Sequence, residues 1–68
     1  MEISARNQLK GRVKSVRSGD IMSEVVVVLA DGQEITSVIT RDAVEHLQLQ
    51  PGDEVAAVIK STEVMIRK

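Results

Sequence analysis

The 68-residue sequence predicts an all-β fold, a barrel of five short strands with one short helix between the third and fourth strands. Two observations predict this class. Runs of β-branched residues alternate with turn-forming clusters of Gly, Asp, Ser and Pro along the chain. One segment alone shows the apolar spacing of a helix. Because aromatic residues are absent, the core has to be built from aliphatic side chains and methionine.

The first two strands are predicted over residues 9–16 and 21–29, joined by a Ser-Gly-Asp turn. In LKGRVKSV, basic residues interleave with apolar ones, as in a strand with one face in water, and Gly11 indicates a bulge or bend. IMSEVVVVL holds four consecutive valines, whose branched Cβ atoms favour extended backbone. Since this second strand is apolar on both faces, we expect the core to cover one face and another subunit the other.

An Asp-Gly pair, typical of a hairpin, precedes the third strand at residues 34–40, EITSVIT. The helix is predicted in TRDAVEHLQL, where Thr40 can cap the N-terminus and Asp42 is favourable in the first turn. A Pro-Gly-Asp turn ends the helix, and strands follow at residues 54–60, EVAAVIK, and 63–66, EVMI. This order of elements is that of the OB-fold, so we expect an OB-like barrel.

The small size of the chain makes self-association the expected source of additional stability. A domain of this length buries only about 60% of the surface of its unfolded chain, and its core supplies roughly 3–5 kcal/mol. The chain has no cysteine for a disulfide and one histidine, too few for a zinc site. We therefore expect a homo-oligomer that binds no free metal cation.

Charge and hydropathy patterning argue against several kinds of partner. The net charge is −1, whereas binders of nucleic acid or membrane surfaces usually carry a basic footprint. Met1 is followed by polar residues and not by a signal peptide. No apolar run approaches the roughly 20 residues that span a bilayer. We expect a cytoplasmic protein that binds neither nucleic acid nor membrane.

The sequence offers little for catalysis. A Ser-His-Asp arrangement would have to use His46, which the pattern places on the surface of the short helix. The neighbouring carboxylates Asp53 and Glu54 follow a Pro-Gly turn, where solvated acidic residues are ordinary. The sequence has no glycine-rich phosphate-binding loop. We therefore expect that the protein is not an enzyme.

Two stretches near opposite ends of the sequence carry the parts of a small oxyanion site. SARNQ and AVIKSTEVMI both offer hydroxyl groups, backbone N–H groups at the ends of strands and a basic side chain. Backbone amides and hydroxyls donate to the oxygens of an anion, and Lys or Arg adds charge-assisted bonds. Since one subunit offers few such groups, two or more subunits would have to contribute. The same residues could instead merely cap strand ends, and composition leaves both interpretations open.

The motifs SARNQLKG, ITSVIT followed by the short helix, and AVIKSTEVMI resemble the molbindin (Mop-domain) family. The likeness covers residues 1–68, which it makes a single Mop-type OB-like domain. It implies a hexamer, built as a trimer of dimers, that binds molybdate or tungstate between subunits and acts as an intracellular store. These ligands are oxyanions, in agreement with the donor groups of the two stretches.

The resemblance also implies which residues hold the anion. Carried over by motif, they are Ser4, Ala5, Arg6 and Asn7 from one subunit, with Lys60 and Ser61 from a neighbour. Lys60 is expected to provide the main charge. Ser4 and Ser61 are expected to donate through their hydroxyls, and Ala5 through its backbone. Arg6 either contacts the anion or forms an ion pair between subunits.

A second resemblance is local. TRDAVEHLQLQPGDEV resembles the swapped-hairpin transcription factors related to AbrB and MazE, which carry a short helix, a Pro-Gly-Asp turn and an apolar strand. The alternative function is therefore a DNA-binding regulator of this kind, or another OB-type nucleic-acid binder. Its phosphate contacts would fall on the basic strand residues Lys10, Arg12, Lys14 and Arg17. The chain lacks the aromatic residues on which OB barrels stack bases, and this function leaves the two terminal motifs without a role.

Overall fold

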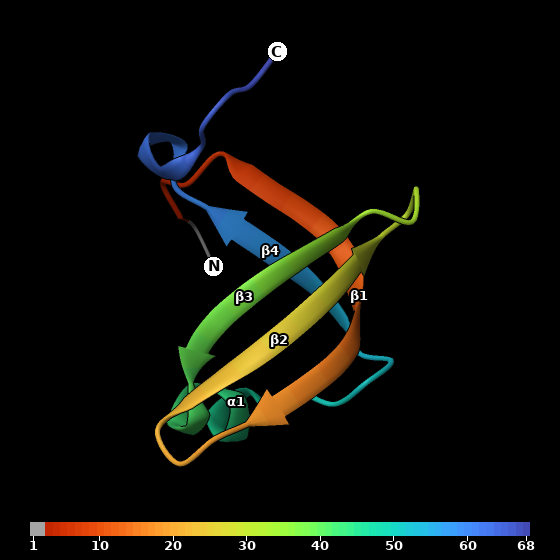
Figure 1. Ribbon diagram of the computed structural model, residues 1–68, viewed down its shortest axis with the longest axis vertical. Helices are drawn as coiled ribbons and strands as arrows, with labels where there is room; N and C mark the ends of the chain where they lie inside the picture. The colour runs from red at the N-terminus through yellow and green to blue at the C-terminus, as the bar shows by residue number, and fades with distance from the viewer. Residues whose placement is uncertain (1–2) are drawn as a thin grey trace.

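A curled four-stranded antiparallel sheet forms the body of the molecule, and a short helix lies at one of its ends (Figure 1). The computed structural model describes residues 3–68. The elements in chain order are β1 (Asn7–Ser18), β2 (Met22–Leu29), β3 (Glu34–Thr40), α1 (Arg41–Leu47), β4 (Glu54–Ile59) and the 3-10 turn η1 (Ser61–Glu63). The strand order is β3-β2-β1-β4. The predicted all-β class is confirmed, as are the first four strands and the helix between the third and fourth.

β1 is the longest strand, and it pairs with two others. Residues 7–12 pair with β4, and residues 11–18 pair with β2, so the two ladders overlap around Gly11. The register with β2 shifts between Val13 and Ser15, which is the mark of a bulge. The sequence pattern predicts an irregularity at Gly11. The bulge lies a few residues further on, and Gly11 has a different task.

Gly11 allows β1 to approach β2 closely. A Cβ atom on Gly11 would lie 2.6 Å from Val27 Cγ1 and 2.6 Å from the carbonyl oxygen of Val28. Both distances are shorter than van der Waals contact, so the added atom would clash. The Val28 carbonyl oxygen is part of the backbone and cannot move aside by a side-chain rotation. Glycine at this position is therefore required by close packing of backbone against backbone.

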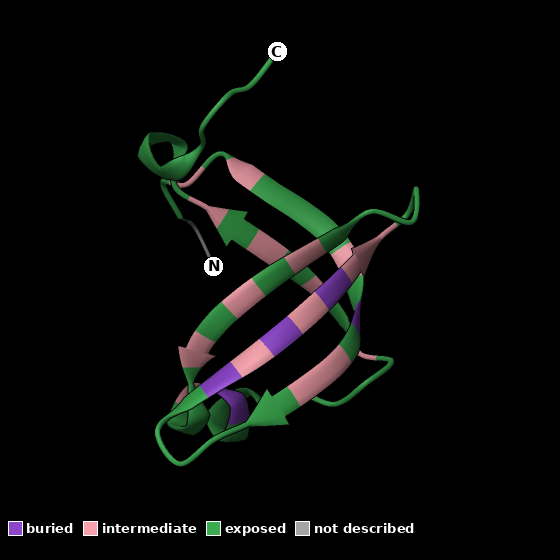
Figure 2. Cartoon of the chain, in the orientation of Figure 1, coloured by how far each residue is buried: buried purple, intermediate pink, exposed green. Residues whose placement is uncertain are grey.

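The core is a small cluster of valines from the inner face of the sheet and from α1. Its buried members, each between 2% and 7% exposed, are Val13, Val25, Val27 and Val44. Along β2, buried residues alternate with half-buried ones (Figure 2). The outward valines of β2, Val26 and Val28, are only half-buried. Within one chain, β2 is therefore buried on its inner face and only half-buried on its outer face. The second subunit expected to cover the outer face is not part of the described chain.

The helix begins and ends where its local chemistry indicates. The Thr40 hydroxyl accepts the backbone N–H of Ala43 at 3.0 Å, which confirms the predicted N-cap. The helix ends at Leu47 because Gln48 adopts a left-handed conformation with a φ of 54°. The helix is therefore shorter than the predicted TRDAVEHLQL. Between residues 3 and 68, no helix has the length and apolar character needed to cross a membrane.

The prediction of a fifth strand at residues 63–66 is wrong for this chain. Ser61–Glu63 form η1, and the residues after it belong to no strand. Val64, Met65 and Ile66 are 46%, 93% and 88% exposed. Figure 1 shows this C-terminal segment extending away from the sheet. A strand exists only by pairing, and these residues have no strand of the described chain beside them, so their apolar pattern is left unburied.

The close approach at Gly11 predicts that Gly11→Ala destabilises the fold. The added methyl group has to displace β2 backbone, and overpacking of this kind typically costs about 1–3 kcal/mol of unfolding free energy. Chemical denaturation followed by far-UV circular dichroism would measure the loss. Gly32→Ala is the comparison for backbone strain without crowding, because a Cβ there meets nothing within 4 Å and its destabilisation comes from the φ of 90° alone. Equal stability of Gly11→Ala and the natural chain would show that β1 does not need this approach.

Candidate oxyanion-binding site

The two terminal motifs meet at one corner of the sheet. Asn7, the first residue of β1, is the register partner of Ile59, the last residue of β4. Residues 4–6 therefore lead into β1 beside the point where Lys60 and Ser61 leave β4. Figure 1 shows the N-terminal segment running next to η1 at this corner. All six residues predicted for the site thus lie at one end of the β1–β4 ladder, within the same chain.

The N-terminal side of the corner is a short arm held by a side chain. Ser4 and Arg6 are exposed, whereas Ala5 and Asn7 are half-buried. The Gln8 Nε2 atom donates a hydrogen bond to the carbonyl oxygen of Ala5 at 3.0 Å. Gln8 belongs to the SARNQ stretch noted in the sequence, but no role was predicted for it. The hydrogen bond from the Gln8 side chain to the Ala5 backbone could not be predicted from the spacing of apolar residues, because neither of its two groups is apolar.

The C-terminal side is shaped by η1. The N–H of Glu63 donates to the carbonyl of Lys60 at 2.9 Å, and the N–H of Val64 donates to the carbonyl of Ser61 at 3.4 Å. These bonds turn the chain immediately after β4. The side chains of Lys60 and Ser61 remain exposed at the turn. The Lys60 ammonium group and the Ser61 hydroxyl group thus come from adjacent residues of a hydrogen-bonded turn.

The charges at the corner are not neutralised within the described part of the chain. Its ion pairs lie elsewhere: Arg12–Glu54 at 3.3 Å, Lys14–Glu34 at 2.8 Å and Arg41–Glu45 at 3.1 Å. Between residues 3 and 68, neither Arg6 nor Lys60 takes part in one. Residues 3–10 contain no carboxylate. The corner therefore combines cations with neutral donors, a set that suits an anion and not a metal cation.

Acidic and imidazole side chains do not gather in the region that the structure describes. There, no group of three or more His, Cys, Asp or Glu residues has the arrangement needed to hold a metal ion. Asp31 in the β2–β3 turn accepts hydrogen bonds from the side chain and backbone of Gln33, and these bonds lower the pKa of its carboxyl. This turn lies on the far side of the sheet from β4.

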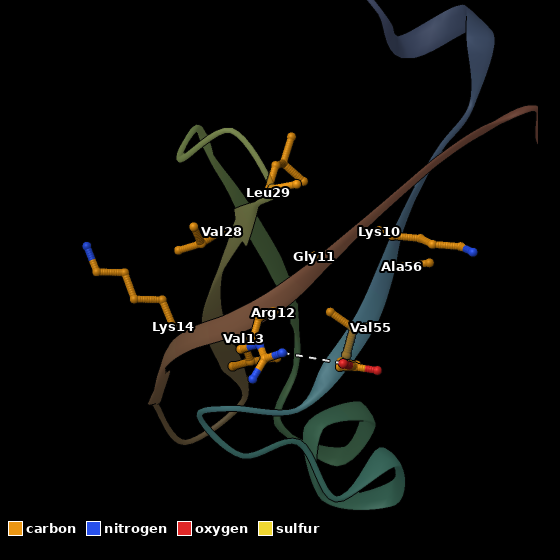
Figure 3. A pocket seen from close by; sticks show the side chains of 11 residues that line it. Lys10, Gly11, Arg12, Val13, Lys14, Val28, Leu29, Val55 and Ala56 are labelled. Atoms are coloured by element: carbon orange, nitrogen blue, oxygen red, sulfur yellow. Dashed lines mark hydrogen bonds and ion pairs between the residues drawn. The ribbon is translucent and has the colours of Figure 1, made fainter.

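A shallow hollow of about 830 Å³ lies over the middle of β1, away from the corner. Its lining includes Gly11, Arg12 and Val55, and the Arg12–Glu54 ion pair crosses it (Figure 3). None of the six predicted site residues lines it. Besides aliphatic side chains, its lining holds the paired cations Arg12 and Lys14, and Lys10, which takes part in no ion pair of residues 3–68. The hollow has no hydroxyl side chain in its lining, whereas the corner has those of Ser4 and Ser61.

The basic strand proposed for DNA contacts is not a continuous cationic strip. Lys14 and Arg12 are each paired with a carboxylate, and Figure 3 shows Lys10 and Lys14 extending to opposite sides of β1. The Pro-Gly-Asp turn, the centre of the second resemblance, is bonded into the fold. The N–H of Gly52 donates to the carbonyl of Val13 at 2.8 Å, and the N–H of Val13 donates to the carbonyl of Asp53 at 2.9 Å. That turn supports β1 structurally.

The fold is that of a small OB-like domain, and one corner of its sheet carries exposed hydroxyl and cationic side chains. Comparison with known families agrees: the model of the TOBE domain matches residues 3–66. The chain belongs to the TOBE domain family, in its Mop type, and the resemblance stated from the motifs is confirmed.

Relatives of the chain carry names that concern molybdenum. It is 56% identical over 66 residues to molybdenum-pterin-binding protein 1 of Clostridium pasteurianum, covering 97% of both chains. Its structure matches a molybdate-binding protein from Sporomusa ovata with a TM-score of 0.95 and 41% identity over the whole of both chains. It also matches the cytoplasmic molybdate-binding protein ModG with molybdate bound, with a TM-score of 0.86 and 46% identity. That match covers 90% of this chain and 43% of ModG.

Proposed function

We propose that this chain binds molybdate or tungstate in the cytoplasm and stores it at sites between the subunits of a homo-oligomer. The observation that carries the proposal is the meeting of SARN and KS at one corner, with Arg6 and Lys60 outside every ion pair of residues 3–68. Relatives named for molybdenum-pterin or molybdate binding match 97% and 100% of the chain. Their names describe binding proteins, and we propose a binding role without catalysis.

Each residue of the corner has a role in this proposal. Lys60 supplies the main positive charge, and the hydroxyls of Ser4 and Ser61 donate to oxygens of the anion. Ala5 and its neighbours contribute backbone N–H groups. Arg6 provides a second charge, directed either at the anion or at a carboxylate of a neighbouring subunit.

One chain cannot enclose the anion. Ser4, Arg6, Lys60 and Ser61 are all exposed, so an ion bound by one corner would keep much of its hydration shell. A two-fold pair of corners would solve this, because an isologous interface sets each patch against the same patch of the partner. Residues 4–7 of one subunit would then face Lys60 and Ser61 of the other.

Assembly is also favoured by the exposed apolar surface. The tail residues Val64, Met65 and Ile66 are exposed, whereas four hydrophobic side chains are buried among residues 3–68. Tight burial of large apolar side chains is worth roughly 1.5–3 kcal/mol each, a large sum for a chain of this size. We propose that the tail is buried against another subunit and, as the family resemblance implies, that the assembly is a hexamer formed as a trimer of dimers.

Selectivity would follow from donor geometry. Molybdate and sulfate are both tetrahedral dianions, but molybdate is larger. A rigid cage of N–H and O–H donors set to its radius would leave stretched hydrogen bonds around sulfate. Phosphate is partly protonated at neutral pH, and its proton would find no acceptor in such a cage.

Lys60→Ala is expected to weaken molybdate binding by about 10- to 100-fold, the value of a hydrogen bond to a charged group. Calorimetric titration of anion-stripped protein, with sulfate and phosphate as competitors, measures this. Lys14→Ala is the matched control, since it removes the same charge from a lysine paired with Glu34. No heat with molybdate from the folded natural chain would remove the proposed function and make DNA binding the next test. Unchanged affinity of Lys60→Ala alone would refute the site assignment.

Ile66→Asp is expected to lower the mass of the particle in solution, because it places a charge in the proposed apolar contact. Light scattering coupled to size exclusion would report the change. His46→Asp adds the same side chain at an exposed position of α1 and should leave the mass as in the natural chain. A natural chain that runs as a monomer at all concentrations would contradict the assembly directly.

A further inference from the structure

The side chain of Gln8 fixes the backbone of the arm that leads into β1. Its Nε2 atom lies 3.0 Å from the carbonyl oxygen of Ala5. A carbonyl oxygen only accepts, so the amide nitrogen is the end of Gln8 that faces it. Residues 4–6 precede the first ladder pair, Asn7↔Ile59, and are held by no strand. Within residues 3–68, no other side chain forms a hydrogen bond to this arm.

Holding one carbonyl fixes the direction of the next N–H group. The C=O of Ala5 and the N–H of Arg6 belong to one planar trans peptide unit, in which they point in opposite directions. When Gln8 holds the Ala5 oxygen on its own side, the Arg6 N–H is turned to the other side. The same bond occupies the Ala5 oxygen, a partial negative charge that would repel an oxyanion if it turned toward the corner.

We propose that Gln8 is a positioning residue of the anion site, which aims the backbone N–H of Arg6 at a bound tetrahedral oxyanion through its hydrogen bond to Ala5. This inference rests on the proposed function of the corner. Gln8 itself needs no contact with the anion. Its contribution to stability is small, because the bond is exposed and substitutions at such surfaces usually change the unfolding free energy little.

A matched pair of variants separates positioning from general effects. Gln8→Met keeps the length of the side chain but removes the donor. Gln33→Met makes the same change at an exposed glutamine that also bonds a residue nearby, the Asp31 carboxylate of the β2–β3 turn. The first readout needs no ligand: ¹⁵N relaxation of anion-free protein. Gln8→Met should lower the order parameter of the Arg6 amide, and Gln33→Met should leave it unchanged. An unchanged Arg6 amide in Gln8→Met would overturn the proposal whatever the protein binds.

The second readout is calorimetry with molybdate and sulfate at several salt concentrations. Gln8→Met should weaken molybdate binding about 5- to 10-fold, the typical value of one neutral hydrogen bond, and reduce the preference over sulfate. The salt dependence should match that of the natural chain, since every charge is retained. Lys60→Ala should instead flatten it. A looser Arg6 amide with unchanged molybdate affinity would overturn the positioning role. If the natural chain bound no molybdate, the proposed function would fail, and with it the role of Gln8 toward an anion.

Discussion

The structure depends on the double pairing of β1. One strand serves two ladders, and both include the residues around Gly11. This sharing curls the sheet and brings β2 so close to β1 that no Cβ atom fits at Gly11. The antiparallel pairing with β4 has a second consequence, because the start of β1 must then lie beside the end of β4. Two motifs more than fifty residues apart in sequence are thereby placed at one corner.

Local chemistry explains which parts of the fold could be predicted. The valine run of β2 and the cap at Thr40 are signals carried by neighbouring residues, and the structure contains both as expected. The strand predicted for the segment EVMI is absent for a physical reason. The apolar pattern of the segment indicates that it is buried, but it does not distinguish burial in its own chain from burial against another subunit. Among residues 3–68, no strand pairs with this segment. The contact of Gln8 with Ala5 was equally hidden, since it depends on one rotamer and not on any periodic pattern. The site residues themselves came from motif resemblance, and their roles toward an anion remain predictions.

The proposed anion site and the proposed assembly share one segment of chain. Lys60 and Ser61 lie between β4 and the exposed tail that contains Met65 and Ile66. Fixing the tail against a neighbour would fix the turn that presents Lys60, and an anion held between subunits would in turn hold the tail. A ligand that binds only the assembled form stabilises it by mass action. Storage and assembly would therefore be thermodynamically linked, so that anion-loaded protein resists dissociation more than stripped protein does.

Charge and direction contribute differently at such a site. Lys60 and Arg6 attract any small dianion, and sulfate carries the same formal charge as molybdate. Attraction by these two cations therefore raises affinity for both ions and separates them little. Discrimination has to come from donors whose positions cannot adjust to a smaller ion. Backbone N–H groups meet this condition when the peptide that carries them is held, as the Ala5–Arg6 peptide is by Gln8. On this view the residues that set selectivity at the corner are the neutral ones, and the rigid β1–β4 ladder beneath them is part of the recognition.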